Sequence, residues 1–171
     1  PANAIHNMPV DICHGWQRPQ LAALEAGCSG FADTCFGVIH PDEAAGFKQG
    51  CFHKLPGDAF AKVSATLLGS YSPSAIGGMQ RTHVASVPAE SCTGWTDPQI
   101  GNLQELFPYD SCSGFSFKCI AKLTPGAAKG LFAACIQNLP PDAFCQVSSQ
   151  LLSTFTPAVV GAMKAVHILN L

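Results

Sequence analysis

The amino-acid sequence predicts an all-α protein, a solenoid of short helices with ten rungs of sixteen residues in two tandem copies. Apolar residues recur at positions 0, 5, 8 and 13 of a sixteen-residue line, and proline recurs at its second or third position. Strands are not expected, because the apolar residues do not alternate with period two and Ala, Gly and Pro are abundant. The lines that begin at Leu123, Leu139 and Phe155 show the pattern most clearly, and Leu171 begins a further line.

The lines group into two copies of one longer unit. The segment that starts at Cys28 matches the segment that starts at Cys112, at an offset of 84 residues, and the segment from Met8 matches that from Val87 at an offset of 79. The two offsets differ through a change in loop length between the matched segments. We therefore divide the chain into a tail of residues 1–7, a first copy of residues 8–86 and a second copy of residues 87–171. Each copy contains five rungs, and the copies are expected to pack continuously.

Each rung is expected to open with a helix. Ser72, Thr124 and Thr156 each precede a proline directly, which is an N-cap followed by proline at the first helical position. Glycine recurs just before the apolar residue at position 8, where it can end a short helix in a left-handed conformation. These glycines are Gly15, Gly30, Gly46, Gly94, Gly114 and Gly130. The pattern predicts two short helices per rung with a tight turn between them.

The alternative is one helix of about twelve residues per line, which would give an antiparallel bundle of ten helices. Pro19 and Pro98 lie in the middle of the first line of each copy, and a proline inside a helix costs about 3 kcal/mol. The bundle is therefore disfavoured for these two rungs. For the last three rungs the sequence leaves the alternative open.

The segments LPPDAF at 139–144 and LTPGAAKGL at 123–131 resemble the IPxxAFxGL portion of extracellular leucine-rich repeats. The resemblance covers nearly the whole chain and implies stacked repeats that contain short helices. The LxLxxN segment, which builds the sheet of a leucine-rich repeat, is absent. The concave β-face of that family and its binding properties are therefore not expected here.

Nine cysteines in 171 residues indicate disulfides in an oxidising compartment, which predicts a secreted, extracellular protein. None of them forms a C-x-x-C pair, so zinc ribbons, thioredoxin-like motifs and haem attachment are disfavoured. Cys145 is matched by Ala61 in the first copy, and we interpret it as an unpaired buried apolar residue or as the site of an intermolecular bridge. The other eight are the disulfide candidates and form two equivalent sets of four: Cys13, Cys28, Cys35 and Cys51, and Cys92, Cys112, Cys119 and Cys135.

Three connectivities are compatible with the spacing. If equal positions of adjacent rungs are stacked, Cys13 pairs with Cys28 and Cys35 with Cys51, with equivalent pairs in the second copy. An antiparallel bundle instead joins Cys13 to Cys35 and Cys28 to Cys51. A third arrangement places the bridge within one rung, between Cys28 and Cys35. The first is expected of a solenoid, but spacing alone does not decide connectivity.

No catalytic residue, metal ligand or cofactor site is predicted, and the chain is not expected to be an enzyme. It contains no G-x-G-x-x-G, Walker, H-E-x-x-H or G-x-S-x-G motif. His83 and His167 occupy the same core-facing position in the two copies, which favours hydrogen-bonded structural histidines over metal ligands. Trp16 and Trp95 follow glycine at the apolar position 8, which favours core packing over stacking on a sugar.

Composition excludes several partners. The formal net charge is −2 and the nine Lys and Arg are scattered, so no basic surface for nucleic acid is expected. No apolar run is long enough for a membrane span. Only 12% of the residues are charged, against about a quarter in typical soluble domains, so part of the surface is expected to be covered in use.

The last rung, residues 155–170, has an outer face as apolar as its internal counterpart, and solenoids that stay monomeric need polar caps. We therefore expect copies of the chain to dock head to tail into an extracellular filament or sheath. The alternative is a secreted binding module, an adhesin or carrier whose partner is a glycan or an apolar ligand. The residues expected at the assembly interface are Met8, Pro9, Cys13, Trp16, Val159, Val160, Met163, Ile168 and Leu171.

Overall fold

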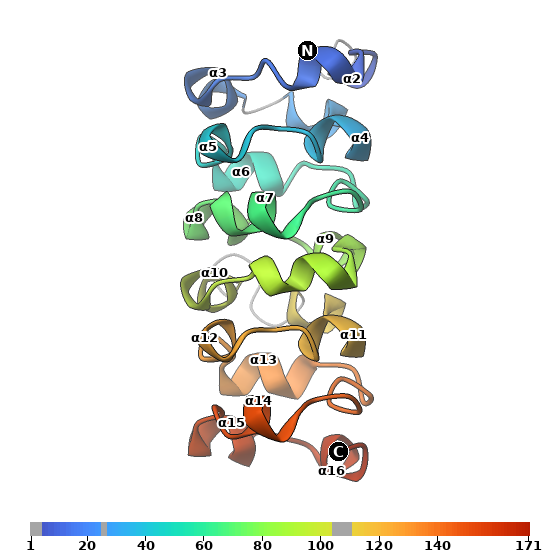
Figure 1. Cartoon of the computed structure of the whole chain (residues 1–171), viewed down its shortest axis with the longest axis vertical. Helices are drawn as coiled ribbons and strands as arrows, with labels where there is room; N and C mark the ends of the chain where they lie inside the picture. The colour runs from blue at the N-terminus through green and yellow to red at the C-terminus, as the bar shows by residue number, and fades with distance from the viewer. Residues whose placement is uncertain (1–4, 25–26, 104–110) are drawn as a thin grey trace.

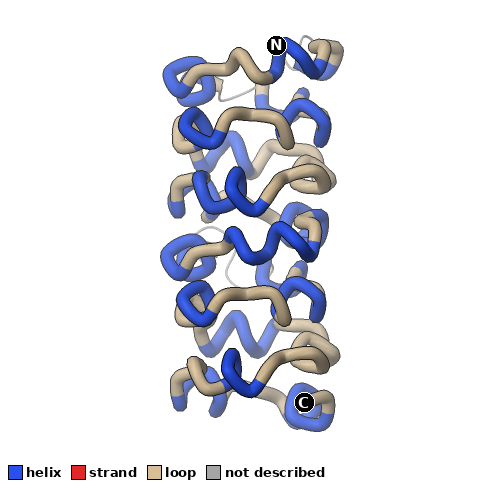
Figure 2. Tube along the Cα trace, in the orientation of Figure 1, coloured by secondary structure: helices blue, strands red, loops and turns tan. Residues whose placement is uncertain are grey.

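The computed structural model describes residues 5–24, 27–103 and 111–171, and all regular secondary structure in these residues is helical. The helices are short and form an elongated stack, with the N-terminus at one end and the C-terminus at the other (Figure 1). Helices and loops alternate along the whole stack (Figure 2). The described part of the chain is therefore all-α, as predicted.

No described helix exceeds six residues, so the expected alternative of twelve-residue helices is wrong for these parts of the chain. Up to residue 86 the elements are α2 (Val10–Cys13), α3 (Arg18–Ala23), the 3-10 helix η1 (Cys28–Gly30), α4 (Asp33–Phe36), α5 (Pro41–Ala44), α6 (Gln49–Phe52), α7 (Ala65–Ser70), α8 (Pro73–Ile76) and α9 (Arg81–Ser86). After residue 86 they are η2 (Ala89–Gly94), α10 (Asp97–Asn102), η3 (Ser111–Gly114), α11 (Phe117–Ile120), α12 (Pro125–Ala128), α13 (Ala133–Asn138), α14 (Ser149–Leu152), α15 (Pro157–Gly161) and α16 (Ala165–Leu169).

Side-chain caps start many of these helices. The hydroxyl of Ser72 accepts the N–H of Ala75 at 3.2 Å, and the hydroxyl of Thr124 accepts the N–H of Ala127 at 3.1 Å. Thr156 caps α15 in the same way. Each cap satisfies one of the N–H groups that the first turn of a helix leaves without a partner. The three predicted caps are confirmed.

The helices follow a spacing of eight residues. From α5 to α10 they begin at residues 41, 49, 65, 73, 81, 89 and 97, and a turn at 57–62 takes the place in between. From α11 to α16 they begin at 117, 125, 133, 149, 157 and 165, with a turn at 141–146. A sixteen-residue line therefore contains two short units, but in the lines at 55–70 and 139–154 the first unit is a turn and not the predicted helix.

Three consecutive units complete one circuit of the stack. Helix α5 packs against α7, α6 against α8 and α8 against α10, and in each pair the second helix begins 24 residues after the first. Because one circuit takes three units and a sixteen-residue rung supplies only two, equal positions on adjacent rungs do not lie over each other. The rung is the sequence repeat, but it is not the unit of stacking.

The recurring glycines mark places where neighbouring circuits touch through their backbones. A Cβ atom at Gly94 would lie 2.0 Å from the carbonyl oxygen of Ala65, and one at Gly130 would lie 2.3 Å from that of Asp97. Gly46 and Gly114 approach the preceding circuit in the same way. None of these four glycines has the positive φ expected from the sequence, so the left-handed interpretation is wrong for them. Glycine is present because no side chain fits between the two backbones.

An apolar core runs along the stack and contains most of the predicted apolar columns, but Val160 and Ile168 of the last rung are exposed. Up to residue 86 it is rich in phenylalanine, with ring centroids of Phe36 and Phe60 4.9 Å apart. Ile120 takes the place of Phe36 after an offset of 84 residues and is equally buried. Ile5, in the segment assigned to the tail, is buried in the same core.

The backbone contact at Gly94 yields a test of the stacking. We expect Gly94→Ala to lower the free energy of unfolding by about 1–3 kcal/mol, because the methyl group must push two circuits apart. Gly101→Ala is the matched control, since no atom lies within 4 Å of its Cβ position and the equivalent residue is Ala22. Urea-induced unfolding measures both variants. Equal stabilities of the two variants would contradict the proposed contact.

Candidate functional site

The exposed large apolar side chains lie at the two ends of the stack. Among the described residues they belong to α2, to α15, and to α16 with the residues that follow it. Leu169 is 85% exposed and Ile168 is 56% exposed. At the N-terminal end the exposed residues are Val10 and Ile12, and at the C-terminal end they are Val160, Val166, Ile168, Leu169 and Leu171. We call these two surfaces the N-terminal face and the C-terminal face.

The N-terminal face has an open, mostly apolar hollow of about 200 Å³. Its lining comes from α2, α3 and the residues that flank α2: Met8, Ile12, Gly15, Trp16 and Gln20. The indole of Trp16 is half-buried, with its ring centroid 5.9 Å from that of Phe31. Trp16, which packs against the buried Phe31, therefore forms part of the lining of the hollow, and the hollow is open to solvent.

Residues of both faces have equivalents in the interior of the stack, and these equivalents are buried. The offset of 84 residues relates Ile168 to Val84, which is 2% exposed. The offset of 79 relates the half-buried Trp16 to Trp95, which is also 2% exposed. Two further pairs behave alike, namely Val160 with Ile76 and Met163 with Met79. These positions are thus buried where another circuit packs against them, and they are exposed or half-buried at the two faces, where no further circuit of the described chain is present.

The nine residues expected at the assembly interface differ in their exposure to solvent. Pro9, Val160, Ile168 and Leu171 are exposed, and Met8, Trp16 and Met163 are half-buried. Cys13 and Val159 are buried inside the chain, so neither side chain faces outward, which corrects their assignment to the interface.

Four exposed residues were missed: Val10, Ile12, Val166 and Leu169. They lie between the apolar columns of the line, and the columns select the inward positions of each helix. Apolar residues at off-column positions were therefore the available signal for an outward apolar surface.

The eight candidate cysteines form four disulfides, each with a Cα–Cα distance of 5.3 Å. Each disulfide joins two elements that pack together in neighbouring circuits, such as α2 with α4 and η1 with α6. No disulfide of the described residues joins residues 8–86 to residues 87–171. The bonds are Cys13–Cys35, Cys28–Cys51, Cys92–Cys119 and Cys112–Cys135.

This connectivity is the one expected for an antiparallel bundle, although the described helices are too short to form a bundle of long helices. The pairing of equal positions on adjacent rungs is not formed, and neither is the bridge within one rung. The reason is the circuit of three units, since Cys13 and Cys35 are 22 residues apart and therefore lie in adjacent circuits. Disulfides of this kind are typical of oxidising compartments.

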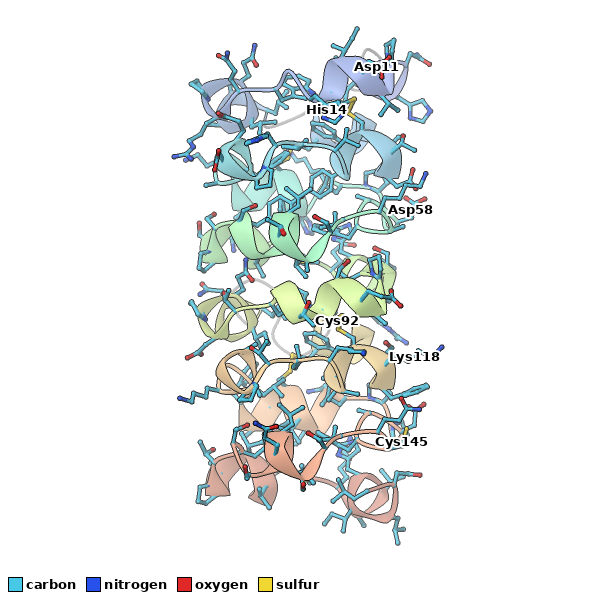
Figure 3. All side chains as sticks on the ribbon, in the orientation of Figure 1. Asp11, His14, Asp58, Cys92, Lys118 and Cys145 are labelled. Carbon is cyan, nitrogen blue, oxygen red and sulfur yellow. A yellow bond between two sulfur atoms is a disulfide. The ribbon has the colours of Figure 1, made fainter. Side chains whose placement is uncertain are left out.

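Cys145 is free and exposed, in the turn at 141–146 near the C-terminal face. Figure 3 shows it at the outer edge of the stack. The interpretation as a buried apolar residue is therefore wrong.

The two matched histidines have structural roles. Nδ1 of His83 accepts the N–H of Gln80 at 2.9 Å, and its Nε2 donates to the carbonyl oxygen of Leu55 at 3.0 Å. His167 makes the equivalent bonds to Lys164 and Leu139. With Nδ1 accepting and Nε2 donating, the imidazole of His83 is bound in its neutral form. Burial lowers the pKa of His83 by removing water from the charged form.

The rest of the described chain offers little for chemistry. In residues 5–24, 27–103 and 111–171, no three His, Cys, Asp or Glu side chains are close enough together to hold a metal ion. Trp95 packs against Phe115, with ring centroids 5.5 Å apart. None of the described helices has the length and apolar character that crossing a bilayer requires.

The fold and the two faces define an all-helical, disulfide-crosslinked stack of short units with an apolar surface at each end. Comparisons with protein-family models, with curated proteins and with solved structures find no match to this chain. Function must therefore be inferred from the faces themselves.

The buried His83 predicts a pH dependence of stability. Because its pKa in the folded state lies below the ordinary value of 6.5, the unfolded chain binds more protons just below pH 6.5. We expect the free energy of unfolding to fall as the pH falls through this window and to level off below the folded-state pKa. Urea unfolding at several pH values between 8 and 4 measures the slope. The His83→Gln variant should have a shallower slope near pH 6, and an unchanged slope would contradict the assignment.

Proposed function

We propose that the chain is an extracellular structural protein whose copies associate head to tail into a filament or sheath. The observation that carries the proposal is the pair of apolar faces at opposite ends of the stack, together with the burial of their equivalents inside it. An exposed apolar surface rimmed by polar residues is typical of a protein–protein interface. The two faces are formed by different residues. In the proposed contact the C-terminal face of one copy therefore packs against the N-terminal face of the next.

We infer that the architecture is a continuous solenoid of two tandem copies. The bond from His83 to Leu55 recurs as the bond from His167 to Leu139, and each copy carries two disulfides at matched positions. A heterologous contact of this kind gives an open filament when its rotation does not close and a ring when it does. A solenoid built of equal circuits is suited to such growth, because each added copy continues the stack.

An extracellular location is supported by the four disulfides. By restraining the unfolded chain, each loop of more than twenty residues contributes about 3 kcal/mol. A chain of this size does not need them to fold, since its core is large enough. The disulfides are therefore interpreted as protection in an oxidising, exposed setting.

A secreted binding module is the second candidate, and one groove favours it. Trp95, Asp97, Thr124 and Lys129 are among the residues that line an open groove of about 370 Å³ between α10 and α12. This volume lies within the range of about 300–1,000 Å³ found for small-molecule sites. The hollow on the N-terminal face is smaller than this range, which disfavours an apolar-ligand carrier. A glycan that binds saturably to a monomer would favour this candidate over assembly.

Sedimentation velocity of the purified chain over a wide range of concentrations tests assembly. We expect species larger than dimers to grow with concentration, and electron microscopy to show filaments or rings. The experiment uses the Cys145→Ala background, which copies Ala61 and removes adventitious disulfides. Ile168→Asp should weaken association at least about tenfold, because it places a charge in an apolar contact.

Gln137→Asp is the control for this prediction. It adds the same charge at an exposed position of α13, away from both faces, and should assemble like the parent. A single 17.9 kDa species at every concentration would rule out the proposed function.

A further inference from the structure

The contact between the two halves of the chain is a template for a contact between two chains. Inside the stack α7 packs against η2, α8 against α10 and α9 against η3. The C-terminal face presents the equivalents of the first partners, α14, α15 and α16. The N-terminal region presents the equivalents of the second partners, α2, α3 and η1.

We propose, building on the proposed function, that the joint between two copies repeats this internal joint residue for residue. In this arrangement Gly15 and Gln20 of one copy fix its register on the C-terminal face of the preceding copy. The partner is thus a second copy of this chain in one defined orientation.

Gly15 has the geometry that the joint requires. Its equivalent Gly94 lies against the carbonyl of Ala65, which a Cβ atom would approach to 2.0 Å. The nearest atom to a Cβ at Gly15 is the carbonyl oxygen of Ile12 in its own turn, at 3.3 Å. Among the described residues, nothing requires glycine at position 15 as strongly as the Ala65 carbonyl requires it at position 94. In the proposed joint Gly15 lies against the carbonyl of Ser149, the equivalent of Ala65.

The side chain of Gln20 is oriented like that of Gln99, whose amide donates to two backbone carbonyls of the preceding circuit. The Oε1 atom of Gln99 accepts the N–H of Thr96 at 3.0 Å, and its Nε2 donates to the carbonyls of Leu68 and Tyr71 at 2.9 and 2.8 Å. The Oε1 atom of Gln20 accepts the N–H of Gln17 at 2.9 Å, which orients the side chain in the same way. Gln20 is exposed, and its Nε2 has no hydrogen-bond partner among the described residues.

The matching acceptors lie on the C-terminal face. The equivalents of Leu68 and Tyr71 are Leu152 and Phe155, at the junction of α14 and α15. The Leu152 carbonyl accepts the N–H of Phe155 at 3.1 Å, as the Leu68 carbonyl accepts that of Tyr71 at 3.4 Å. No described residue donates to the Phe155 carbonyl. The Gln20 amide of the next copy therefore finds the same pair of carbonyls that Gln99 uses.

The repeated joint has a steric consequence at the N-terminus. Residues 5–8 and residues 168–171 are both equivalent to residues 84–87, and all three segments form the same turn. The N–H of the last residue donates to the carbonyl of the first in each case: Met8 to Ile5 at 3.0 Å, Val87 to Val84 at 3.2 Å and Leu171 to Ile168 at 3.3 Å. The internal joint has room for one such turn, formed by residues 84–87. In a joint between two copies, residues 168–171 of one copy and residues 5–8 of the other would occupy that same place, so one of the two segments must move away.

The segment that leaves is Ile5–Met8. The competing turn belongs to α16, a five-residue helix that the buried His167 ties to Leu139. Ile5–Met8 therefore acts as a plug that covers the N-terminal region until α16 of another copy replaces it.

Three variants test this joint by sedimentation velocity in the Cys145→Ala background. Gly15→Ala places a methyl group against the Ser149 carbonyl of the other copy. Gln20→Glu keeps the Oε1 acceptor and removes the amide donor. Each should weaken association at least about tenfold while the thermal unfolding midpoint stays unchanged. Deletion of residues 1–7 should strengthen association several-fold, because α16 of the other copy no longer has to displace the plug.

Two matched controls accompany these variants. Gly50→Ala adds the same methyl group where no atom lies within 4 Å, and its equivalent is already Ala134. Gln137→Glu adds the same charge away from both faces. Both should assemble like the parent.

The outcomes separate this inference from the proposed function. If the parent assembles and Gly15→Ala and Gln20→Glu assemble equally well, the register is wrong while head-to-tail growth stands. If deletion of residues 1–7 leaves association unchanged or weaker, residues 5–8 of one copy and 168–171 of the other do not compete for one position. The proposal that the joint repeats the internal contact is then wrong. A parent chain that stays monomeric removes both proposals.

Discussion

Hydrogen bonds from buried polar side chains to the backbone of the preceding circuit hold this fold together. The fully buried polar residues of the described chain are few, and each donates to a backbone carbonyl between 28 and 32 residues earlier. Helices of four to six residues leave most of their carbonyls without an intrahelical donor. A buried carbonyl without a partner is costly, so a donor from the next circuit stabilises the stack where it reaches such a carbonyl. These donors are His83, Ser91, Gln99, Ser111 and His167.

Much of the local structure could be predicted from the sequence, because local spacing determines it. Ser72, Thr124 and Thr156 mark helix starts through their own chemistry, and the apolar columns mark the buried side of each unit. The number of units per circuit could not be predicted, since it depends on the angle through which each connection turns the chain. The pairing of equal positions on adjacent rungs, one of the three connectivities considered, was wrong for the same reason, because Cys13 meets Cys35 only when a circuit takes three units.

The glycines and the two faces show the same limit. A glycine at the end of a short helix is compatible with a left-handed turn and with a close backbone contact, and only the neighbouring circuit distinguishes them. At Gly94 that neighbour is Ala65, 29 residues earlier in the chain. The candidate interface was predicted mainly from the apolar columns, so Leu169, which lies between them, was missed. Val159 also lies between them and was included, although it is buried.

No disulfide of the described residues crosses the internal joint between the two halves of the chain. All four disulfides lie within one half or the other, and the contact between the halves consists of backbone approaches such as Gly94 on Ala65 and the amide of Gln99. Within one chain this joint forms at no loss of translational freedom. Between two chains the same contacts must also offset the entropy of association, which is several kcal/mol.

The composition of the faces agrees with that requirement. If they were solvent-facing caps, their residues would be more polar than the internal equivalents, because solenoid ends are normally capped by polar residues. The change goes the other way at six of the seven exposed large apolar residues of the described chain, and each added methylene contributes about 0.8 kcal/mol when it is buried. Val160 is the exception, since its equivalent Ile76 is larger. The pairs in which the residue at the face is the more apolar or larger one are Val10 and Ala89, Ile12 and Ser91, Val166 and Thr82, Ile168 and Val84, Leu169 and Ala85, and Leu171 and Val87.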